Sequence, residues 1–269
     1  MLEKLRNGRN VYGTCITSPA PGWMQVLKNA GLDFAFIDTE HIALDRSEMS
    51  KMCYAASTSG LTPIVRIPAP DPYLACQAID AGAKGVIAPY LETVEQIRDL
   101  VGATKFRPLK GRILQEILEG KSAPNAELKA YLDKYNQGNL CIVNIESMPA
   151  MEKLDELLSV PGVDGVFIGP HDLSISLGVP EQYDHPEFEK AVKFIIQTTR
   201  NKGLSIAIHL SLEPERQVKW IKEGVNIVVH SSDRALFSQK LNTDIQVIRK
   251  ATGDQPVNER ASKEDLPVV

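Results

Sequence analysis

The stretch FAFIDTEHIALD, residues 34–45, places three ionisable side chains directly after a short apolar run. Residues 34–37 predict a buried strand, and Asp38, Glu40 and His41 stand at its end. An imidazole beside carboxylates suits general acid–base catalysis, because its pKa lies near neutral pH. Such a group needs further polar partners, which other elements of the chain must bring to the same place.

Polar residues also follow several other apolar runs. They are Arg66 within the end of 63–67, Pro89 after the fourth run, Glu146 after 141–145, His171 and Asp172 after 165–169, His209 at the end of 205–209, and His230 with Asp233 after 226–230. Four of the five histidines lie at such ends, and His185 is the exception. Any single histidine can instead be an ordinary surface or core residue, so the set carries more weight than its members.

The elements that position these residues alternate in type along the chain. Eight apolar, β-branched runs predict strands at 11–17, 34–37, 63–67, 85–89, 141–145, 165–169, 205–209 and 226–230. Segments of helical period lie between them, at 45–58, 71–82, 93–104, 147–160, 185–203 and 213–224. This order predicts an α/β fold, a closed (β/α)8 TIM barrel whose strand ends share one face. A doubly wound open sheet is the alternative, but no GxGxxG or P-loop follows a strand.

Glu146 and Asp172 are the candidate metal ligands. Two carboxylates that converge at one end of a barrel repel each other unless a cation or a shared proton lies between them. Oxygen ligands with open positions suit Mg²⁺ or Mn²⁺ better than zinc. The structural alternative is that each caps a helix, as Asp172 could do before LSISLG.

Arg66 is the candidate anion-binding residue, because a guanidinium at a buried strand end is costly unless it meets an anion. Its structural alternative is an ion pair with Asp38 or Glu40. No lysine lies at a predicted strand end, since Lys84 precedes the fourth run. A Schiff-base mechanism therefore lacks its nucleophile.

Four motifs resemble those of the HpcH/HpaI aldolase family, the metal-dependent class II pyruvate aldolases (2-dehydro-3-deoxyglucarate aldolase-like). They are IDTEH at 37–41, VRIP at 65–68, IES at 145–147 and GVDGVFIGPHDLSISLG at 162–178. The resemblance covers roughly residues 10 to 250. It implies a phosphoenolpyruvate/pyruvate-type barrel that assembles into homo-oligomers, trimers or hexamers, with the last helix exchanged between neighbours in some members.

The resemblance also implies roles for single residues. Glu146 and Asp172 match the metal ligands, and Asn144 matches a polar residue near the metal. Arg66 matches the residue that binds the keto oxygen of pyruvate, and His41 with Asp38 matches the acid–base pair. Gly169 and Pro170 match the segment beside the pyruvate carboxylate. The implied cofactor is a divalent metal ion, Mg²⁺ or Mn²⁺ with Co²⁺ as a further candidate. The implied activity is a reversible cleavage of a 4-hydroxy-2-oxo acid to pyruvate and an aldehyde through a metal-bound enolate.

His171 departs from the family pattern, since many relatives carry a small residue between Pro170 and Asp172. Its imidazole would stand next to the metal and the pyruvate, so we expect it to affect substrate binding. Two other functions remain open on the same residues. One is related enolate chemistry, either a citrate-lyase-like cleavage or a condensation with oxaloacetate as donor, and the other is a barrel that binds a 2-oxo acid without turnover.

Composition excludes several classes of protein. The net charge is −4, and no Lys/Arg cluster interleaved with aromatics predicts a nucleic-acid partner. No apolar run is long enough to span a membrane and the N-terminus lacks a signal-peptide pattern, so we expect a cytoplasmic protein. The four scattered cysteines predict buried thiols rather than disulfides or a zinc site.

The domain organisation expected from these patterns is simple. Residues 1–250 form one catalytic barrel, and residues 251–269 form a polar tail that is disordered or loosely docked. The long connection 105–125 predicts a lid or binding loop, because long loops in compact domains often cover a site.

Overall fold

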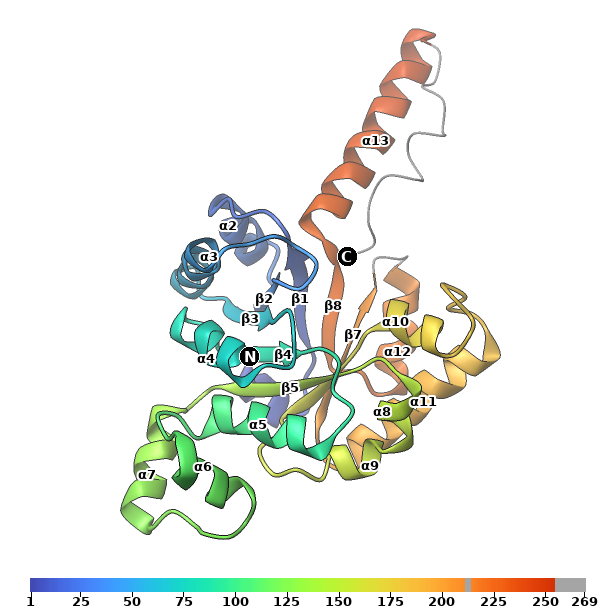
Figure 1. Ribbon diagram of the computed structural model, residues 1–269. Coiled ribbons are helices and arrows are strands. Elements are labelled where there is room, and N and C mark those ends of the chain that lie inside the picture. The colour runs from blue at the N-terminus through green and yellow to red at the C-terminus, as the bar shows by residue number, and fades with distance from the viewer. Residues whose placement is uncertain (211–213, 255–269) are drawn as a thin grey trace.

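Eight short apolar runs form strands, and each strand pairs in parallel with the next one along the chain. The strands are β1 (Val11–Ile16), β2 (Phe34–Asp38), β3 (Thr62–Arg66), β4 (Gly85–Ala88), β5 (Leu140–Ile145), β6 (Gly165–Ile168), β7 (Ser205–Leu210) and β8 (Ile227–Ser232). Because β8 pairs back onto β1, the sheet closes into a barrel in this computed structural model, which describes residues 1–210 and 214–254 (Figure 1). The predicted (β/α)8 barrel is confirmed, with every strand end within two residues of its predicted position.

The strands are apolar almost throughout because both of their faces are buried. Side chains such as Phe34, Phe36 and Phe167 fill the barrel interior, and the Phe36 and Phe167 rings lie 5.4 Å apart. Alternate residues such as Ile37 and Val65 point outward, into the layer between the strands and the surrounding helices. This double burial explains why the strands read as continuous apolar runs rather than as alternating patterns.

Helices cover the outside of the barrel between successive strands. They are α1 (Leu2–Arg6), α2 (Gly22–Asn29), α3 (Arg46–Thr58), α4 (Pro72–Asp80), α5 (Val94–Lys105), α6 (Gly111–Leu118), α7 (Ala126–Tyr135), α8 (Met148–Glu152), α9 (Leu154–Leu157), α10 (Pro170–Ser176), α11 (Pro186–Asn201), α12 (Pro214–Glu223) and α13 (Asp233–Thr252). Local capping defines several of their starts. Asp45 and Glu48 form a capping box at α3, and Thr93 and Gln96 form one at α5.

The connection 105–125 is not a lid over the C-terminal ends of the strands, so that prediction was wrong. The connection contains α6, which packs against α5, and leads into α7, which lies beside α6 in Figure 1. Lys105, at its start, contacts Asp164 (2.5 Å) and the carbonyl of Asn139 (2.6 Å), residues that precede β6 and β5. A segment that follows a barrel helix leads back to the N-terminal ends of the strands. This insertion therefore lies at that end of the barrel, away from the C-terminal ends of the strands.

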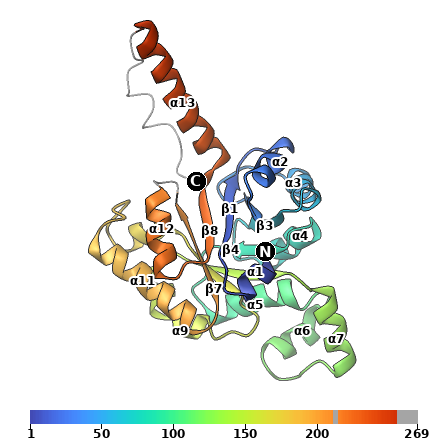
Figure 2. The ribbon, with the colours of Figure 1, turned by 180° about the vertical axis from the view of Figure 1, so that it is seen from behind.

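The last described helix, α13, stands away from the barrel (Figures 1 and 2). Of its residues, only Asp233 is buried, while Phe237, Leu241 and Val247 are exposed apolar residues along its length. The helix ends at Gly253 in a left-handed conformation, which is a common helix terminator. The predicted tail 251–269 therefore begins within this helix, and its residues 255–269 lie outside the described part of the chain.

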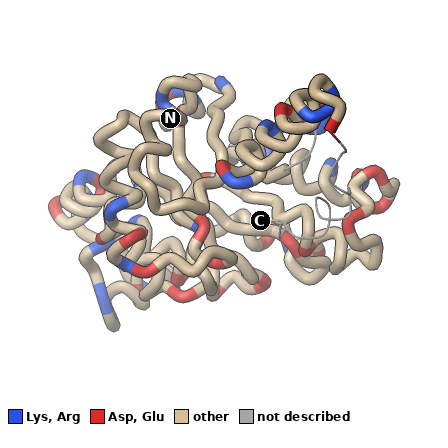
Figure 3. Tube along the Cα trace, turned by 90° about the horizontal axis from the view of Figure 1, so that it is seen from above, with Lys and Arg blue, Asp and Glu red and all other residues tan. Residues whose placement is uncertain are grey.

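Charged residues are mixed over the surface. Figure 3 shows Lys and Arg interspersed with Asp and Glu along the trace. Among the described residues, no helix is long and apolar enough to cross a membrane.

Candidate active site

A cavity of about 1040 Å³ opens at the C-terminal ends of the strands. Six of the residues to which the sequence analysis gave a catalytic, substrate-binding or metal-binding role line it, namely His41, Arg66, Gly169, Pro170, His171 and Asp172. Two more lie against it, because a Cβ built on Gly169 would be 2.7 Å from Oε2 of Glu146 and 3.4 Å from Oδ1 of Asn144. Gly169 is therefore required sterically, since any side chain there would displace the carboxylate.

Arg66 is buried in the floor of this site, with 5% of its surface exposed. Its Nε and Nη2 donate to the two carboxylate oxygens of Asp38, at 2.9 and 2.5 Å, and Oε2 of Glu40 lies 3.1 Å from Nε. Burial opposes ionisation of both groups, but the hydrogen bonds between them raise the pKa of Arg66 and lower that of Asp38. The ion pair weighed in the sequence analysis is present, and Arg66 also reaches the cavity.

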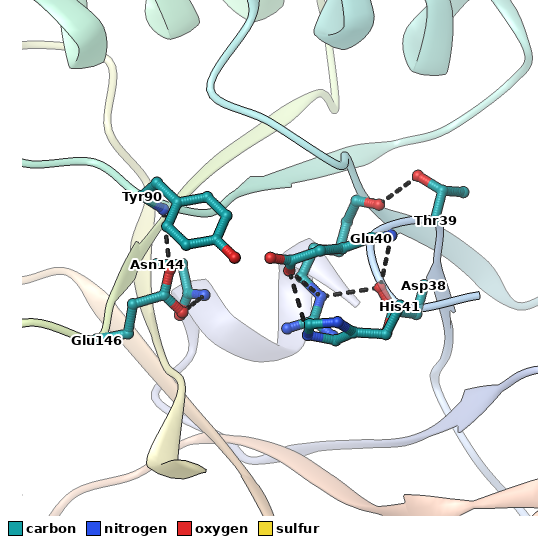
Figure 4. Close-up of polar contacts among 8 residues, drawn as sticks. Asp38, Thr39, Glu40, His41, Tyr90, Asn144 and Glu146 are labelled. Atoms are coloured by element: carbon teal, nitrogen blue, oxygen red, sulfur yellow. Dashed lines mark hydrogen bonds and ion pairs between the residues drawn. The ribbon is translucent and has the colours of Figure 1, made fainter. Parts of the chain in front are cut away.

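The partner of Asp38 differs from the expected one. The sequence analysis paired Asp38 with His41, but the hydrogen bonds of its carboxylate go to Arg66 and to the backbone N–H of Glu40 (3.0 Å). The reason is the strand register, because Asp38 on β2 is the direct neighbour of Arg66 on β3. The carboxylate beside His41 is that of Glu40, whose Oε2 lies 3.7 Å from Nε2 of the imidazole (Figure 4).

Glu40 is a site residue to which the sequence analysis gave no role. Its side chain is 7% exposed and lies between Arg66 and His41. Burial raises the pKa of this carboxyl, and Arg66 and His41 partly offset that rise. The sequence signal for Glu40 was its position between Asp38 and His41, at the end of the same strand.

Glu146 is the most strongly perturbed carboxylate of the site. It is 6% exposed, and burial raises its pKa to about 7, with the negative charge of Asp172 adding to the effect. The backbone N–H of Tyr90 donates to its Oε1 at 2.9 Å, and Nδ2 of Asn144 donates to its Oε2 at 2.5 Å. An electropositive group would favour the ionised form of this carboxyl.

The residues around Glu146 fit a hard divalent cation. Oδ1 of Asn144 is buried without a hydrogen-bond partner, so an oxygen ligand is oriented and unsatisfied beside the carboxylate. Together with Asp172, this gives an all-oxygen donor set, which suits Mg²⁺ or Mn²⁺. Within the described residues, no group of three or more His, Cys, Asp or Glu side chains could hold a metal by itself. Mg²⁺ in such a site keeps water or substrate oxygens as its remaining ligands.

Tyr90 is a second site residue that the sequence analysis missed. It follows β4 with φ of +54°, a conformation that is uncommon for a residue other than glycine. This backbone turn aims its N–H at Glu146, while Figure 4 shows its hydroxyl directed at Glu40 across the site. The negative charge of Glu40 is the largest cause of a raised pKa for this phenol, and burial and the charges of Glu146 and Asp172 add to it. No sequence pattern announces such a backbone conformation.

Two of the remaining strand-end residues, Asp233 and His209, have structural contacts, whereas Nδ1 of His230 is buried without a hydrogen-bond partner. Asp233 accepts hydrogen bonds from Thr17 and Ser18, which ties the start of α13 to the loop after β1. His209 lines the cavity, and burial lowers its pKa to about 4, while its Nε2 lies 3.1 Å from the carbonyl oxygen of Ser231. Asp172 lies inside the first turn of α10 and is not the N-cap, which is Gly169. The capping alternative for Asp172 is therefore not realised.

Comparisons with known proteins agree with the barrel fold and identify a family. A sequence model of the HpcH/HpaI aldolase/citrate lyase family matches residues 13–239. The chain is 30% identical, over 247 residues and 92% of both proteins, to the 2-keto-3-deoxy-L-rhamnonate aldolase of Salmonella gallinarum. The crystal structure of an HpcH/HpaI aldolase from Desulfitobacterium hafniense superposes with a TM-score of 0.83 at 25% identity, covering 95% of this chain and 99% of the other. The citrate synthase SbnG superposes with a TM-score of 0.80 at 27% identity, covering 94% and 98%.

The family match extends over nearly the whole barrel and includes the strand ends that build the cavity. This chain belongs to the HpcH/HpaI aldolase/citrate lyase family and is a carbon–carbon lyase.

Proposed function

We propose that the chain is a class II aldolase that reversibly cleaves a 4-hydroxy-2-oxo acid to pyruvate and an aldehyde. The observation that carries the proposal is that the buried guanidinium of Arg66 and the carboxylate of Asp172 line one cavity, with the oxygen donors Glu146 and Asn144 beside Gly169 of the same lining. No lysine is among the described residues that line this cavity. The similarity to 2-keto-3-deoxy-L-rhamnonate aldolases, whose name describes a substrate of this kind, supports it.

Glu146 and Asp172 would hold a divalent cation, with Asn144 contributing its unsatisfied oxygen. When bound, such a cation acts as a Lewis acid that polarises the carbonyl of a 2-oxo acid. Mg²⁺ and Mn²⁺ are the proposed metals, and Co²⁺ is a further candidate.

Arg66 would donate to the keto oxygen and stabilise the negative charge that develops there, a contribution worth roughly 3 kcal/mol for one preorganised donor. Asp38 and Glu40 hold the guanidinium in one orientation through the contacts at 2.5 to 3.1 Å. Because these partners lock its rotamer, little reorganisation is needed when charge develops. Gly169 and Pro170 leave room for the substrate carboxylate beside Glu146.

His41 would move the proton of the reaction at its imidazole, which reaches the cavity and is half-exposed. Glu40 lies beside this imidazole and would orient it, so that Glu40 rather than Asp38 is the proposed carboxylate partner of His41. The buried carboxyl of Glu40 is also bound to Arg66, so one residue couples the oxyanion-stabilising group to the proton-transfer group.

The proposal is tested by incubating purified protein with 2-keto-3-deoxy-L-rhamnonate and measuring pyruvate with lactate dehydrogenase. Pyruvate release that requires Mg²⁺ or Mn²⁺ and falls at least 100-fold in Arg66→Lys is expected, because lysine lacks the planar fork that binds Asp38. The control is Arg98→Lys, which changes an exposed arginine in an ion pair on α5. Failure to release pyruvate from this or any other 4-hydroxy-2-oxo acid would contradict the proposal.

A second candidate function is a condensation in which oxaloacetate is the donor. The observation that favours it is the structural similarity to the citrate synthase SbnG at 27% identity. Comparing oxaloacetate and pyruvate as donors with the same acceptor separates the two functions.

We also propose that the protein is a homo-oligomer, a trimer or hexamer, in which α13 packs against a neighbouring subunit. Phe237 and Val247 are 59% and 63% exposed on this projecting helix, and Leu241 and Ile248 extend the apolar surface. Exposing these apolar side chains to water is unfavourable, and a helix with few contacts to its own chain is only marginally stable. Packing against a neighbouring subunit would remove both costs.

A further inference from the structure

The lining of the cavity contains a glutamate with an unusual backbone. Glu181 lies in the loop between α10 and α11 with φ of +57°, a region that glycine or asparagine occupies far more readily. Glycine at this position would relieve the strain. A charged side chain kept in a left-handed turn that lines a substrate cavity indicates a role for the side chain itself.

A buried serine holds Glu181 next to His171. The Ser174 hydroxyl donates to the carbonyl of His171 at 2.7 Å and accepts from the N–H of Glu181 at 2.9 Å, and Ser174 is fully buried. As a result, Oε1 of Glu181 lies 3.5 Å from Nδ1 of His171, a buried nitrogen that has no hydrogen bond. Ser174 therefore ties the backbones of both residues, and their two polar side chains lie next to each other in the cavity lining.

The charges around this pair are predominantly negative. Of the two guanidinium groups that line the cavity, Arg66 is bound to Asp38, and Arg216 makes a two-pronged ion pair with Asp184 at 2.7 Å. Tyr183, next to the pair, has its phenol pKa raised by burial and by the negative charge of Glu181. A second anionic group on the substrate would approach Glu181 while both cavity arginines are already engaged by carboxylates.

We infer that His171 and Glu181 are the specificity-determining pair for the aldehyde half of the substrate, and that they select an uncharged, hydroxylated aldehyde over one that bears a carboxylate. This inference rests on the proposed aldolase function. Glu181 can accept hydrogen bonds from hydroxyl groups, and His171 offers a second polar group beside it. A carboxylate in the same place would meet like charge without a compensating partner.

The test measures kcat/KM for condensation of pyruvate with glyceraldehyde and with succinic semialdehyde, which carries a carboxylate at its far end. Wild-type protein should favour glyceraldehyde at least tenfold. Glu181→Gln should shift the ratio toward succinic semialdehyde by about tenfold, which corresponds to about 1.4 kcal/mol. The matched control is Glu187→Gln, which makes the same change on an exposed carboxylate outside the cavity lining and should leave the ratio unchanged.

A second variant, Glu181→Gly, separates the side chain from the backbone. Because glycine accepts the positive φ, this variant should have a thermal midpoint no lower than that of wild type and should still lose the preference. If wild type exchanges the methyl protons of pyruvate, two results would overturn the inference and leave the proposed function standing. One is a wild-type preference for succinic semialdehyde, and the other is a kcat/KM ratio within twofold of the wild-type ratio in all three variants. Wild type that neither exchanges these protons nor condenses either aldehyde would overturn both the inference and the proposed function.

Discussion

The backbone N–H of Tyr90 donates a 2.9 Å hydrogen bond to Oε1 of Glu146, so the turn after β4 fixes a carboxylate at the end of β5. Tyr90 adopts φ of +54° to make this bond, and the site therefore includes backbone strain as well as buried charge. Both features are typical of a site that a ligand completes.

Replacing Glu146 by glutamine should stabilise the metal-free protein at high pH. Burial raises the pKa of Glu146 from its usual 4.5 to about 7, so ionisation lowers the free energy of unfolding as pH rises from 4.5 to 7. Complete ionisation of Glu146 lowers the free energy of unfolding by at most about 3 kcal/mol. Glutamine stays neutral, so thermal midpoints in EDTA should show Glu146→Gln more stable than wild type at pH 8 and little changed at pH 4.5.

Metal provides the complementary control for this prediction. Mn²⁺ or Mg²⁺ should raise the thermal midpoint of wild type at pH 8 and should have a much smaller effect on Glu146→Gln. Equal metal-induced shifts in both proteins would show that Glu146 is not a ligand.

Loss of Arg66 should destabilise the protein severely. Arg66→Ala leaves the buried carboxylates of Asp38 and Glu40 without their cation, and breaking a buried pair in this way costs roughly 3–5 kcal/mol. Urea unfolding measures the change, with Arg98→Ala as the control, because its exposed pair with Glu95 should contribute less than about 1 kcal/mol. Similar decreases in the free energy of unfolding for Arg66→Ala and Arg98→Ala would contradict a buried ion pair at Arg66.

His209 should make the protein sensitive to acid. Burial lowers its pKa from 6.5 to about 4, so its contribution to stability is complete above pH 6.5 and is lost as pH falls toward 4. Complete loss of this contribution lowers the free energy of unfolding by at most about 3 kcal/mol. Unfolding free energies between pH 7 and pH 4.5 should fall less steeply in His209→Gln than in wild type, and equal slopes in the two proteins would contradict the burial of this imidazole.

The apolar surface of α13 should control assembly. Phe237→Asp combined with Val247→Asp places charge on the exposed apolar positions and should convert the oligomer to smaller species in light scattering. Gln239→Asp combined with Gln246→Asp is the control, since it also adds two negative charges, at polar and exposed positions of the helix. A monomeric wild type would contradict the proposed role of this helix.

The fold could be predicted from sequence because the strands are buried on both faces. Each therefore appears as a continuous apolar run, and eight runs alternating with helical segments define a barrel. The connection 105–125 was misassigned because its length was taken as evidence of a lid, although a segment that follows a helix must return to the opposite end of the barrel. Its helix α6 packs on α5, where Leu114 and Leu118 lie next to Gly102.

The site could be predicted only in part. The rule that catalytic residues follow barrel strands located His41, Arg66 and Asp172, all of which line the cavity. The pairing of Asp38 with Arg66 depends on the register of β2 against β3, which one sequence does not specify. Positive φ at Tyr90 and Glu181 has no signature in residue type, so their positions required the structure.

The most direct test of the proposed chemistry is deuterium exchange into the methyl group of pyruvate, followed by NMR. The account predicts that wild-type protein exchanges the methyl protons with Mn²⁺ or Mg²⁺ and stops when EDTA is added, and that Glu146→Ala exchanges none with either metal. Exchange that persists in EDTA, or that survives in Glu146→Ala, would contradict the assignment of Glu146 to a metal site that activates a 2-oxo acid.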